Sequence, residues 1–437
     1  MCSFLFTNCK NFDLDKANFL LQKRGPDYTG VHIELGFTYV HNLLSITGNS
    51  SKQPIVSDSL NVLFNGEIYN YKEFGNFESD SECIGDIYLS KGSGGLVEID
   101  GEFSILLHDK VKRKIILATD TFGTKPLYWA IDGDKIGVAS YPDPLKILGF
   151  KDPLRCKPNT LLELDDKDFR VISESTIFEF DLEQKKDSYD DWKIAFRESI
   201  EKRTSELKHN ILLPLSSGYD SGLIACVLNS IGIDYVSYSI IGSESAQILN
   251  SRISANLNTI KEIIPSIKKD DIESVVSSFV KNVQHFGYGP NPYEITHDGF
   301  SDPGAIGLYY ILRDSIEKYN TKIVLSGQGA DEIMSNIQTY GFKTKNPEFF
   351  GFDIKGIFPW GNFYMGSQWS YLMKEECIAG SLGIETRYPF LDRKLVQEYI
   401  WLNPELKNRS YKSPIRSYLD DLGYPYHNNK IGFNIGQ

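Results

Sequence analysis

Two short apolar runs in the second half of the chain each lead into a loop of small and acidic residues. Ile211–Leu215 runs into Ser216–Ser221, and Lys322–Leu325 runs into Ser326–Glu332. Helical and strand patterns alternate around them, which predicts a parallel sheet with helices on both faces. In such sheets ligands bind beyond the carboxyl ends of the strands. We therefore expect both loops at one ligand-binding edge.

The alternation extends through the rest of this half. Periodicity predicts helices at Trp192–Lys208, Ser221–Ile231 and Tyr309–Tyr319, and a further strand at Tyr235–Ile241. Residues 192–437 are therefore predicted to form an α/β domain.

The first part of the chain has a different sequence pattern, with short β-rich runs separated by Gly, Asp and Asn. This pattern predicts an α+β domain over residues 2–165, with a helix at Ser81–Ser90. Residues 166–191 are rich in charged side chains and contain neither Gly nor Pro, so a charged connector is predicted there. The predicted strands are Ser3–Thr7, Leu60–Phe64, Phe103–His108, Lys114–Ala118 and Leu127–Ile131.

Composition limits the classes of function. A chain of 437 residues is too long for one core, and its net charge of −12 argues against a nucleic-acid surface. The six cysteines and seven histidines show neither a metal-type spacing nor a disulfide framework, which favours a reducing compartment. Because no apolar run reaches membrane length and no signal-peptide pattern is present, a cytoplasmic protein without a membrane partner is expected.

The Ser216–Ser221 loop is suited to binding an anion. Backbone N–H groups of a small-residue loop that leads into a helix bind phosphate, and Asp220 offers a hard oxygen ligand for Mg²⁺. The loop lacks the Gly-Lys-Ser/Thr ending of a Walker loop, so transfer of a γ-phosphate is not indicated. The structural alternatives are a plain tight turn and, for Asp331, a helix cap. Two such loops at one sheet edge favour a nucleotide site.

These loops and several other segments resemble a known family. Ser216–Ser221 is similar to the SGGxDS signature of PP-loop ATP pyrophosphatases, with Ser217 replacing its second residue. Ser326–Glu332 resembles the SGEGxDE segment of class II, N-terminal-cysteine glutamine-dependent asparagine synthetases of the asparagine synthetase B type. Gly383–Asp392, the surroundings of Lys412, and Lys430–Phe433 are similar to further segments of that family.

The first part of the chain resembles the glutaminase domain of the same family. The resemblance runs in order through nearly the whole chain, and it implies an Ntn-hydrolase sandwich followed by a PP-loop ATP pyrophosphatase domain. The matching segments are Cys2 directly after Met1, Arg24–Asp27 (RGPD), Asn65–Asn70 (NGEIYN), Ser79–Glu82 (SDxE), and Asp120 with Phe122–Tyr128 (RDxFGxKPLY).

The resemblance implies a glutaminase reaction at Cys2. The α-amino group freed by removal of Met1 would deprotonate the thiol, which would attack the glutamine side-chain amide and form a thioester. Asn65 and the Gly66 backbone are implied as donors to the oxyanion. A small buried hydrophobe is the structural alternative for Cys2. The implied glutamine-binding residues are Arg24, Asp27, Glu67 and Asp80, the last for the substrate ammonium.

The second domain is implied to adenylate a carboxylate, by default aspartate, and to release pyrophosphate before ammonia attacks. ATP and Mg²⁺ are the implied cofactors, with Asp220 and Asp331 as metal ligands and Lys412 paired with pyrophosphate. The sequence leaves the oligomeric state open, with a homodimer as one expectation. The other implied nucleotide- and pyrophosphate-binding residues are Ser216, Ser217, Gly218, Ser221, Ser326, Gly327 and Gln328.

Several departures from the family pattern bear on function. Leu43 stands where the family has an arginine that grips the glutamine carboxylate, and Gln328 replaces a glutamate that could take a proton from ammonia. The sequence ends four residues after Phe433, which suggests an acceptor pocket that is open or is closed by another chain. Gly242–Asp302 has little family match and is expected to carry acceptor specificity. The aromatic-rich Phe349–Trp369 segment is expected to pack internally rather than bind a sugar or base.

Three alternatives to asparagine synthesis remain. One is the same chemistry on another carboxylate, in a sugar, antibiotic or peptide pathway. Another is an intramolecular amide-former of the β-lactam synthetase type, although Cys2 speaks against it because those relatives lack the thiol. The last is an inactive regulatory homologue.

Overall fold

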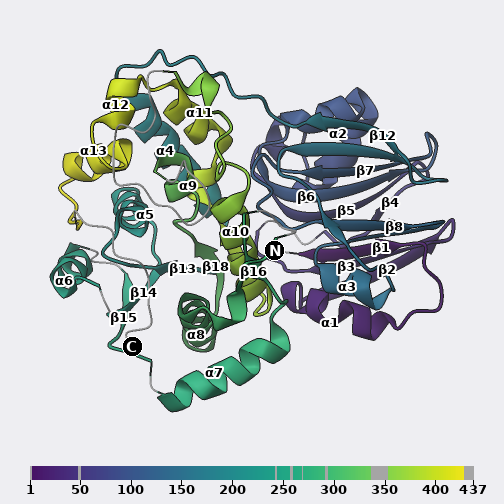
Figure 1. The fold of residues 1–437 in the computed structure, drawn as a ribbon, viewed down its shortest axis with the longest axis horizontal. Helices are drawn as coiled ribbons and strands as arrows, with labels where there is room; N and C mark the ends of the chain where they lie inside the picture. Colours follow the sequence, from purple (N-terminus) through teal and green to yellow (C-terminus); the bar gives the residue numbers. More distant parts are fainter. Residues whose placement is uncertain are drawn as a thin grey trace. The chain divides into compact units, whose positions relative to one another are not determined.

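The computed structural model describes residues 2–47, 51–241, 244–255, 259–267, 269–290, 294–335 and 353–427. Lys430–Phe433 and the first aromatic residues of the Phe349–Trp369 segment lie outside these ranges. The chain divides into two compact units (Figure 1). Unit 1 comprises Met1–Glu179 with Ala379–Gly383, and unit 2 comprises Phe180–Ile378 with Ile384–Gln437.

Unit 1 contains two six-stranded sheets in which every pairing between neighbours is antiparallel. Their strand orders are β10-β8-β9-β1-β3-β2 and β12-β11-β7-β6-β5-β4. The first sheet consists of β1 (Ser3–Thr7), β2 (Tyr28–Glu34), β3 (Phe37–Leu43), β8 (Tyr128–Asp132), β9 (Lys135–Ala139) and β10 (Leu154–Arg155). The second consists of β4 (Ile55–Val56), β5 (Leu60–Ile68), β6 (Gly101–Asp109), β7 (Lys114–Thr119), β11 (Thr160–Asp165) and β12 (Val171–Thr176).

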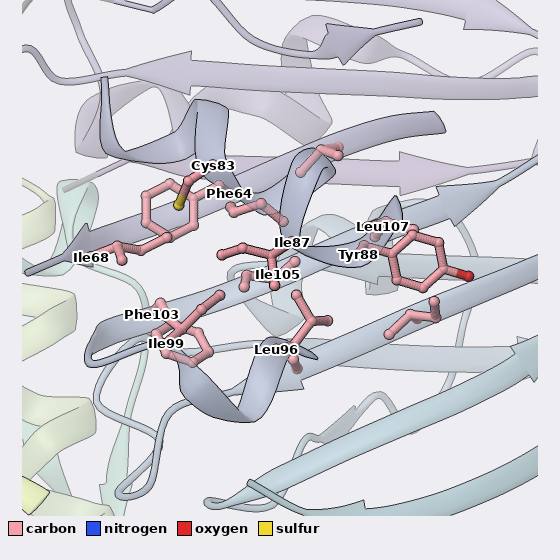
Figure 2. Packing of buried hydrophobic residues seen from close by; sticks show 14 of the residues in the cluster. Phe64, Ile68, Cys83, Ile87, Tyr88, Leu96, Ile99, Phe103, Ile105 and Leu107 are labelled. Carbon is pink, nitrogen blue, oxygen red and sulfur yellow. The ribbon is translucent and has the colours of Figure 1, made fainter. Parts of the chain in front are cut away.

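The inner strands of the second sheet, β5, β6, β7 and β11, are almost entirely buried, which explains why they are rich in apolar residues. The edge strand β12 is exposed. Successive side chains of a strand point to opposite faces. On β6, Ile105 and Leu107 pack against α2 (Cys83–Lys91), where they meet Ile87 (Figure 2). Leu106 points the other way and packs with Phe6 of β1 in the first sheet. The sandwich core therefore lies between the sheets, and α2 covers the outer face of the second.

The remaining helices of unit 1 are α1 (Leu14–Arg24) and α3 (Pro142–Ile147), which pack on each other. α1 begins where the Asp13 side chain accepts a hydrogen bond from the Lys16 backbone N–H at 3.0 Å. The five strands predicted for this part are confirmed, and the helix predicted at Ser81–Ser90 is confirmed as α2. The predicted connector contains β12, which pairs with β11. The division into domains 2–165 and 192–437 stays a prediction.

Unit 2 contains a five-stranded parallel sheet in the order β15-β14-β13-β18-β19. The predicted parallel sheet is thus confirmed. From β13 the chain builds outward through β14 and β15, then returns to the other side of β13 with β18, so the strand order reverses between β13 and β18. Ligands bind at such a reversal in parallel sheets. The strands are β13 (Asn210–Pro214), β14 (Val236–Ile240), β15 (Ile260–Ile264), β18 (Thr321–Leu325) and β19 (Glu385–Arg387).

Helices flank this sheet, and the three that were predicted from periodicity are confirmed as α4, α5 and α8. A separate hairpin pairs β16 (Gly287–Tyr288) with β17 (His297–Asp298). No described helix is long and apolar enough to cross a membrane. The helices are α4 (Asp190–Thr204), α5 (Tyr219–Ser230), α6 (Ala246–Ala255), α7 (Lys269–Asn282), α8 (Pro303–Tyr319), α9 (Ala330–Met334), α10 (Gly366–Gly380), α11 (Arg393–Trp401), α12 (Pro404–Asn408) and α13 (Ser413–Asp421).

The described part of the aromatic-rich segment packs internally, as expected. Trp360 and Phe363 are buried and meet edge to face at a centroid distance of 4.8 Å. Phe358 contacts the Phe363 ring at 4.9 Å. Edge-to-face rings of this kind stabilise a core.

Candidate active sites

Cys2 lies directly before β1, with only 7% of its surface exposed. Its backbone nitrogen donates to Asn65 Oδ1 at 3.0 Å, and its carbonyl oxygen accepts from Arg24 Nε at 3.1 Å. These two bonds fix the Cys2 backbone from both sides. Its sulfur, like those of the other five cysteines, is not part of a disulfide bond.

Asn65 and Gly66 lie on β5, where Asn65 contacts the backbone of Cys2, and both were predicted to donate to the oxyanion. Asn65 is fully buried, and its Nδ2 has no hydrogen-bond partner among the described residues. A buried donor left unpaired costs about 1–3 kcal/mol, so this amide is poised to donate to a bound group. Gly66 has φ of +145°, and a Cβ there would overlap the carbonyl oxygen of Glu102 on β6. Only glycine fits at this point of the strand.

The carboxylates predicted to bind glutamine accept hydrogen bonds from backbone N–H groups and from a hydroxyl group of unit 1. Asp80 accepts from the backbone N–H of Ile68, the last residue of β5, at 2.8 Å. Glu67 accepts from the Thr47 hydroxyl at 3.1 Å. Asp27 is exposed and accepts from the Ser45 backbone N–H at 2.8 Å. The role of these groups in binding glutamine stays a prediction.

Arg24 and Leu43 are both buried, unlike an exposed side chain that could bind the substrate carboxylate. Arg24 is fully buried, and besides its bond to Cys2 it donates from Nη1 to the Tyr141 hydroxyl at 2.8 Å. Its guanidinium also lies 4.9 Å from the centroid of the Tyr141 ring. Leu43 is 9% exposed, and its carbonyl oxygen accepts from the Asp27 backbone N–H at 3.0 Å. The observed contacts of Arg24 support the backbone of Cys2, and its predicted role in binding glutamine stays untested.

His41 is a residue at this site that sequence reasoning did not single out. It is fully buried on β3, and its Nε2 lies 3.0 Å from the carbonyl oxygen of Phe64, the residue before Asn65. Burial lowers the pKa of His41 to about 4, so the ring is neutral and donates to that carbonyl. Its position in the stretch that contains Leu43 was the only available signal.

In unit 2, the Ser216–Ser221 loop follows β13 and closes on itself before α5. The backbone N–H of Ser216 donates to Ser221 Oγ at 3.0 Å, and the two hydroxyl oxygens lie 2.9 Å apart. The backbone N–H of Gly218 donates to Ser216 Oγ at 3.1 Å. The loop is thus a compact turn at the start of a helix, which suits an anion.

Two residues that the sequence did not reveal hold this loop from outside. Arg252 on α6 is fully buried and donates from Nη2 to the Gly218 carbonyl oxygen at 2.9 Å and from Nη1 to that of Ser216. The Glu244 carboxylate accepts from the Ser217 backbone N–H at 2.6 Å and from its hydroxyl. Both lie within Gly242–Asp302, the segment expected to carry acceptor specificity, so part of that segment supports the loop.

Lys412 joins the two small-residue loops. It is 3% exposed, and its Nζ lies 2.6 Å from Asp220 Oδ1 and 3.0 Å from Asp331 Oδ1. Burial opposes the charge on Lys412, but Asp220 and Asp331 raise its pKa well above the ordinary value. A Cβ on Gly327 would lie 2.9 Å from Asp220 Cβ, so the loops are in contact. The structure therefore brings together the predicted residues Asp220, Asp331 and Lys412.

The donor set is compatible with Mg²⁺, which proteins commonly hold through one or two carboxylates while phosphates and water complete the octahedron. The described residues contain no group of three or more His, Cys, Asp or Glu that could hold a metal. Asp220 and Asp331 would therefore be the protein ligands, with the remaining ligands supplied by a nucleotide.

Gln328, in the second loop, is bound to the protein through its side chain. Its Nε2 donates to Glu332 Oε2 at 2.9 Å, and its backbone N–H donates to Ser326 Oγ at 3.0 Å. Glu332 is 2% exposed, and its Oε1 accepts from the Ser367 hydroxyl at 3.1 Å. The amide thus has a fixed orientation.

The fold and sites define a class of protein: an Ntn-type sandwich that begins at a buried cysteine, in one chain with a parallel sheet that carries nucleotide-type loops. Comparison with known proteins is consistent with this class. Residues 1–154 match the glutamine amidotransferase domain family, and residues 191–353 match the asparagine synthase family. The chain belongs to the asparagine synthetase B-like family of glutamine amidotransferases.

Similar curated proteins include a putative asparagine synthetase [glutamine-hydrolyzing] 1 of Methanocaldococcus jannaschii, 28% identical over 85% of this chain and 71% of the relative. Asparagine synthetase [glutamine-hydrolyzing] 1 of Lotus japonicus is 26% identical over 96% and 73%. The Gallus gallus asparagine synthetase [glutamine-hydrolyzing] is 26% identical over 91% and 75%.

Among solved structures, a glutamine phosphoribosylpyrophosphate amidotransferase from B. subtilis aligns with a TM-score of 0.34 and 15% identity. The alignment covers 54% of this chain and 65% of that one, which is less than two thirds of its length. Similarity at this level is too weak to support an inference.

Proposed function

We propose that this protein is a glutamine-hydrolysing, ATP-dependent amidotransferase that adenylates aspartate and amidates it to asparagine, releasing AMP and pyrophosphate. The observation that carries the proposal is the contact of Lys412 with both Asp220 and Asp331, at the point where the strand order reverses. An ammonium group between two carboxylates is ready to pair with phosphate oxygens while the carboxylates hold a metal ion.

In the proposed glutaminase reaction, the Cys2 thiolate attacks the side-chain amide carbon of glutamine. The α-amino group of Cys2 takes the thiol proton, since its ordinary pKa lies near neutrality. The orphan Nδ2 of Asn65 and the Gly66 backbone N–H donate to the oxyanion. Ammonia leaves, and water opens the thioester to glutamate.

In the proposed synthetase reaction, a carboxylate oxygen of aspartate attacks the α-phosphorus of ATP, and pyrophosphate leaves. The serine and glycine residues of the two loops bind the phosphates, and Lys412 pairs with pyrophosphate. Mg²⁺, when bound at Asp220 and Asp331, neutralises charge on the phosphates. Arg252 and Glu244 keep the first loop in shape.

One alternative retains this chemistry but uses another carboxylate acceptor. It is favoured by the bond from Gln328 to Glu332, which places an amide where asparagine-forming relatives carry a carboxylate. The predicted domains 2–165 and 192–437 would carry the glutaminase and synthetase reactions. A cytoplasmic location and a homodimer remain predictions.

The proposal is tested with purified protein, ATP, Mg²⁺ and glutamine, by following AMP and pyrophosphate with a panel of carboxylic acids. We expect AMP formation that depends on aspartate, and asparagine as the product. AMP formation only with another carboxylic acid would identify that acid as the acceptor. ADP as the nucleotide product would contradict an adenylating mechanism.

A further inference from the structure

Glu375 on α10 lies beside the loop that follows β18. Its carboxyl group is hydrogen-bonded by the Ser326 side chain, whose oxygen also accepts from the Gln328 backbone N–H at 3.0 Å. The residue is partly exposed, but its Oε2 is buried and no described residue hydrogen-bonds to it. The carboxyl group of Glu375 thus meets the loop through the Ser326 side chain, and its Oε2 has no partner among the described residues.

A buried carboxylate oxygen without a donor is unfavourable, and such groups in folded proteins are expected to meet a partner. The partner here must bring an N–H or O–H group to the loop. Ammonia is a suitable partner for this oxygen, because its N–H groups can donate hydrogen bonds and it loses a proton when it forms an amide.

The two carboxylates of the loop itself are already bound. Asp331 contacts Lys412 at 3.0 Å and accepts from the Tyr411 hydroxyl at 2.8 Å. Glu332 accepts from Gln328 Nε2 at 2.9 Å and from the Ser367 hydroxyl at 3.1 Å. Gln328 itself is a neutral amide and cannot take a proton near neutral pH.

The surroundings of Glu375 tune its carboxyl group toward proton exchange. Burial raises the pKa of Glu375 to about 7, although Lys374 and the Ser326 hydrogen bond oppose this change. The other charged groups that act on it are Glu376 on its own helix and Glu332 on α9, and both raise the pKa further. A general base works best when its pKa lies near the working pH.

We propose that Glu375 accepts the proton released in the amide-forming step. Glu375 thereby takes the role of the carboxylate that the family pattern has at the position of Gln328. The proposal rests on the proposed function. Ammonia attacks the acyl carbon of the adenylate, and a C–N bond forms. The bond from the acyl carbon to the phosphate oxygen breaks, and AMP leaves with the electron pair. The nitrogen loses one proton to the Glu375 carboxylate, which later passes it to water.

The test uses the full chain with aspartate, ATP, Mg²⁺ and ammonium chloride, so that the glutaminase reaction is not needed. Aspartate-dependent exchange of pyrophosphate into ATP, without ammonium, reports adenylation alone. Asparagine formation reports both steps. In Glu375→Gln we expect exchange within about twofold of the wild type, and asparagine formation lower by on the order of 10²–10³-fold. The rise of the wild-type rate through pH 7 should also disappear.

Glu375→Asp keeps a carboxylate and should recover at least about tenfold of the lost rate. It also decides the question if Glu375→Gln does not fold. The matched control is Glu376→Gln, the adjacent buried carboxylate that accepts from the Tyr388 hydroxyl at 3.0 Å. It should keep a rise of the rate with pH, shifted toward lower pH because Glu376 raises the pKa of Glu375.

Normal exchange with unchanged asparagine formation in Glu375→Gln overturns this proposal alone. Loss of exchange in both Glu375 variants also overturns it, because Glu375 would then act in adenylation or folding. Absence of aspartate-dependent exchange in the wild type overturns the proposed function, and this proposal with it.

Discussion

Gly222 on α5 lies directly against the guanidinium group of Arg252 on α6, so closely that a Cβ would overlap Nη2. The same guanidinium donates to the carbonyl oxygens of Ser216 and Gly218. Burial lowers the pKa of Arg252 to about 10, which still leaves it charged at neutral pH. The loop proposed to bind phosphate is therefore shaped by a buried cation from a different helix, and a glycine makes room for that cation.

Gly222→Ala is predicted to weaken ATP binding. The added methyl group would displace the guanidinium and remove its hydrogen bonds to the loop, which should raise the KM for ATP by about tenfold, equivalent to about 1.4 kcal/mol. Steady-state kinetics with ammonium as nitrogen source measures this change. Gly356→Ala is the control, because a Cβ there meets nothing within 4 Å. An unchanged KM in Gly222→Ala would show that Arg252 does not set the loop geometry.

Asp220→Asn and Asp331→Asn are each predicted to abolish conversion of ATP to AMP. Each change removes a proposed metal ligand and a charge partner of Lys412, while glutaminase activity should remain. Ser335→Ala is the matched control, because it removes only the hydroxyl that donates to Asp331 Oδ1 at 3.0 Å. It should lower AMP formation by less than about tenfold. AMP formation that survives in both Asn variants would count against this site.

The sequence predicted strands such as β1 and β7, which are almost entirely buried and consist mainly of apolar residues. It did not predict β2 and β3, whose hairpin turns at Leu35 and Gly36 with φ of +52° and +83°. Tight hairpins of this kind usually carry Asn-Gly or Asp-Gly, and Leu35 gives no such signal. The start of α8 was also missed, because its cap, Asp302 followed by Pro303, precedes the apolar periodic part of the helix.

Residues of the candidate sites were predictable where short motifs carry them. The predicted site residues Asn65 and Cys2 are in contact, as are Lys412, Asp220 and Asp331, and their roles stay predictions. Arg252 and Glu375 were not predictable, because each meets its loop only through contacts between distant parts of the chain, which leave no pattern in the sequence. Their importance depends on burial and on which atoms they meet, and only the folded chain shows both.

Gly66→Ala is predicted to abolish glutamine hydrolysis without preventing ammonium-dependent synthesis. A Cβ would overlap the Glu102 carbonyl oxygen, and φ of +145° is unfavourable for alanine, so β5 must shift together with Asn65. Loss of an oxyanion donor commonly costs 10²–10³-fold in kcat, and we expect about that reduction in glutaminase rate. Gly94→Ala, where a Cβ meets nothing within 4 Å, is the control. A glutaminase rate within threefold of wild type would exclude this part of β5 from the oxyanion site.

Cys2→Ala and Cys2→Ser are predicted to lose glutamine hydrolysis and to retain synthesis from ammonium salts. The thiol is the proposed nucleophile, and its removal leaves the residues of unit 2 unchanged. Mass spectrometry of the intact wild-type protein should show that Met1 is absent. Retained Met1 in an active preparation would contradict a free α-amino base, because that nitrogen would then be part of a peptide bond.

Leu43→Arg is predicted to lower the KM for glutamine, which we expect to be high in the wild type. A guanidinium at this position would supply the charge-assisted contact to the substrate carboxylate that the family pattern contains, and one such contact corresponds to about tenfold to a hundredfold. Ammonium-dependent synthesis should not change.

The competing explanation is that Arg24 binds the glutamine carboxylate in place of the arginine that the family pattern has at the position of Leu43. Arg24→Ala would then raise the KM for glutamine sharply, whereas Leu43→Arg would do little. The observed contacts of Arg24 with the Cys2 carbonyl and with Tyr141 predict a different result, namely a lower kcat with a smaller change in KM. Tyr141→Phe separates the two, because it removes one hydrogen-bond partner of Arg24 and leaves the charge in place. If neither Leu43→Arg nor Arg24→Ala changes the KM for glutamine, the glutamine carboxylate binds elsewhere in unit 1.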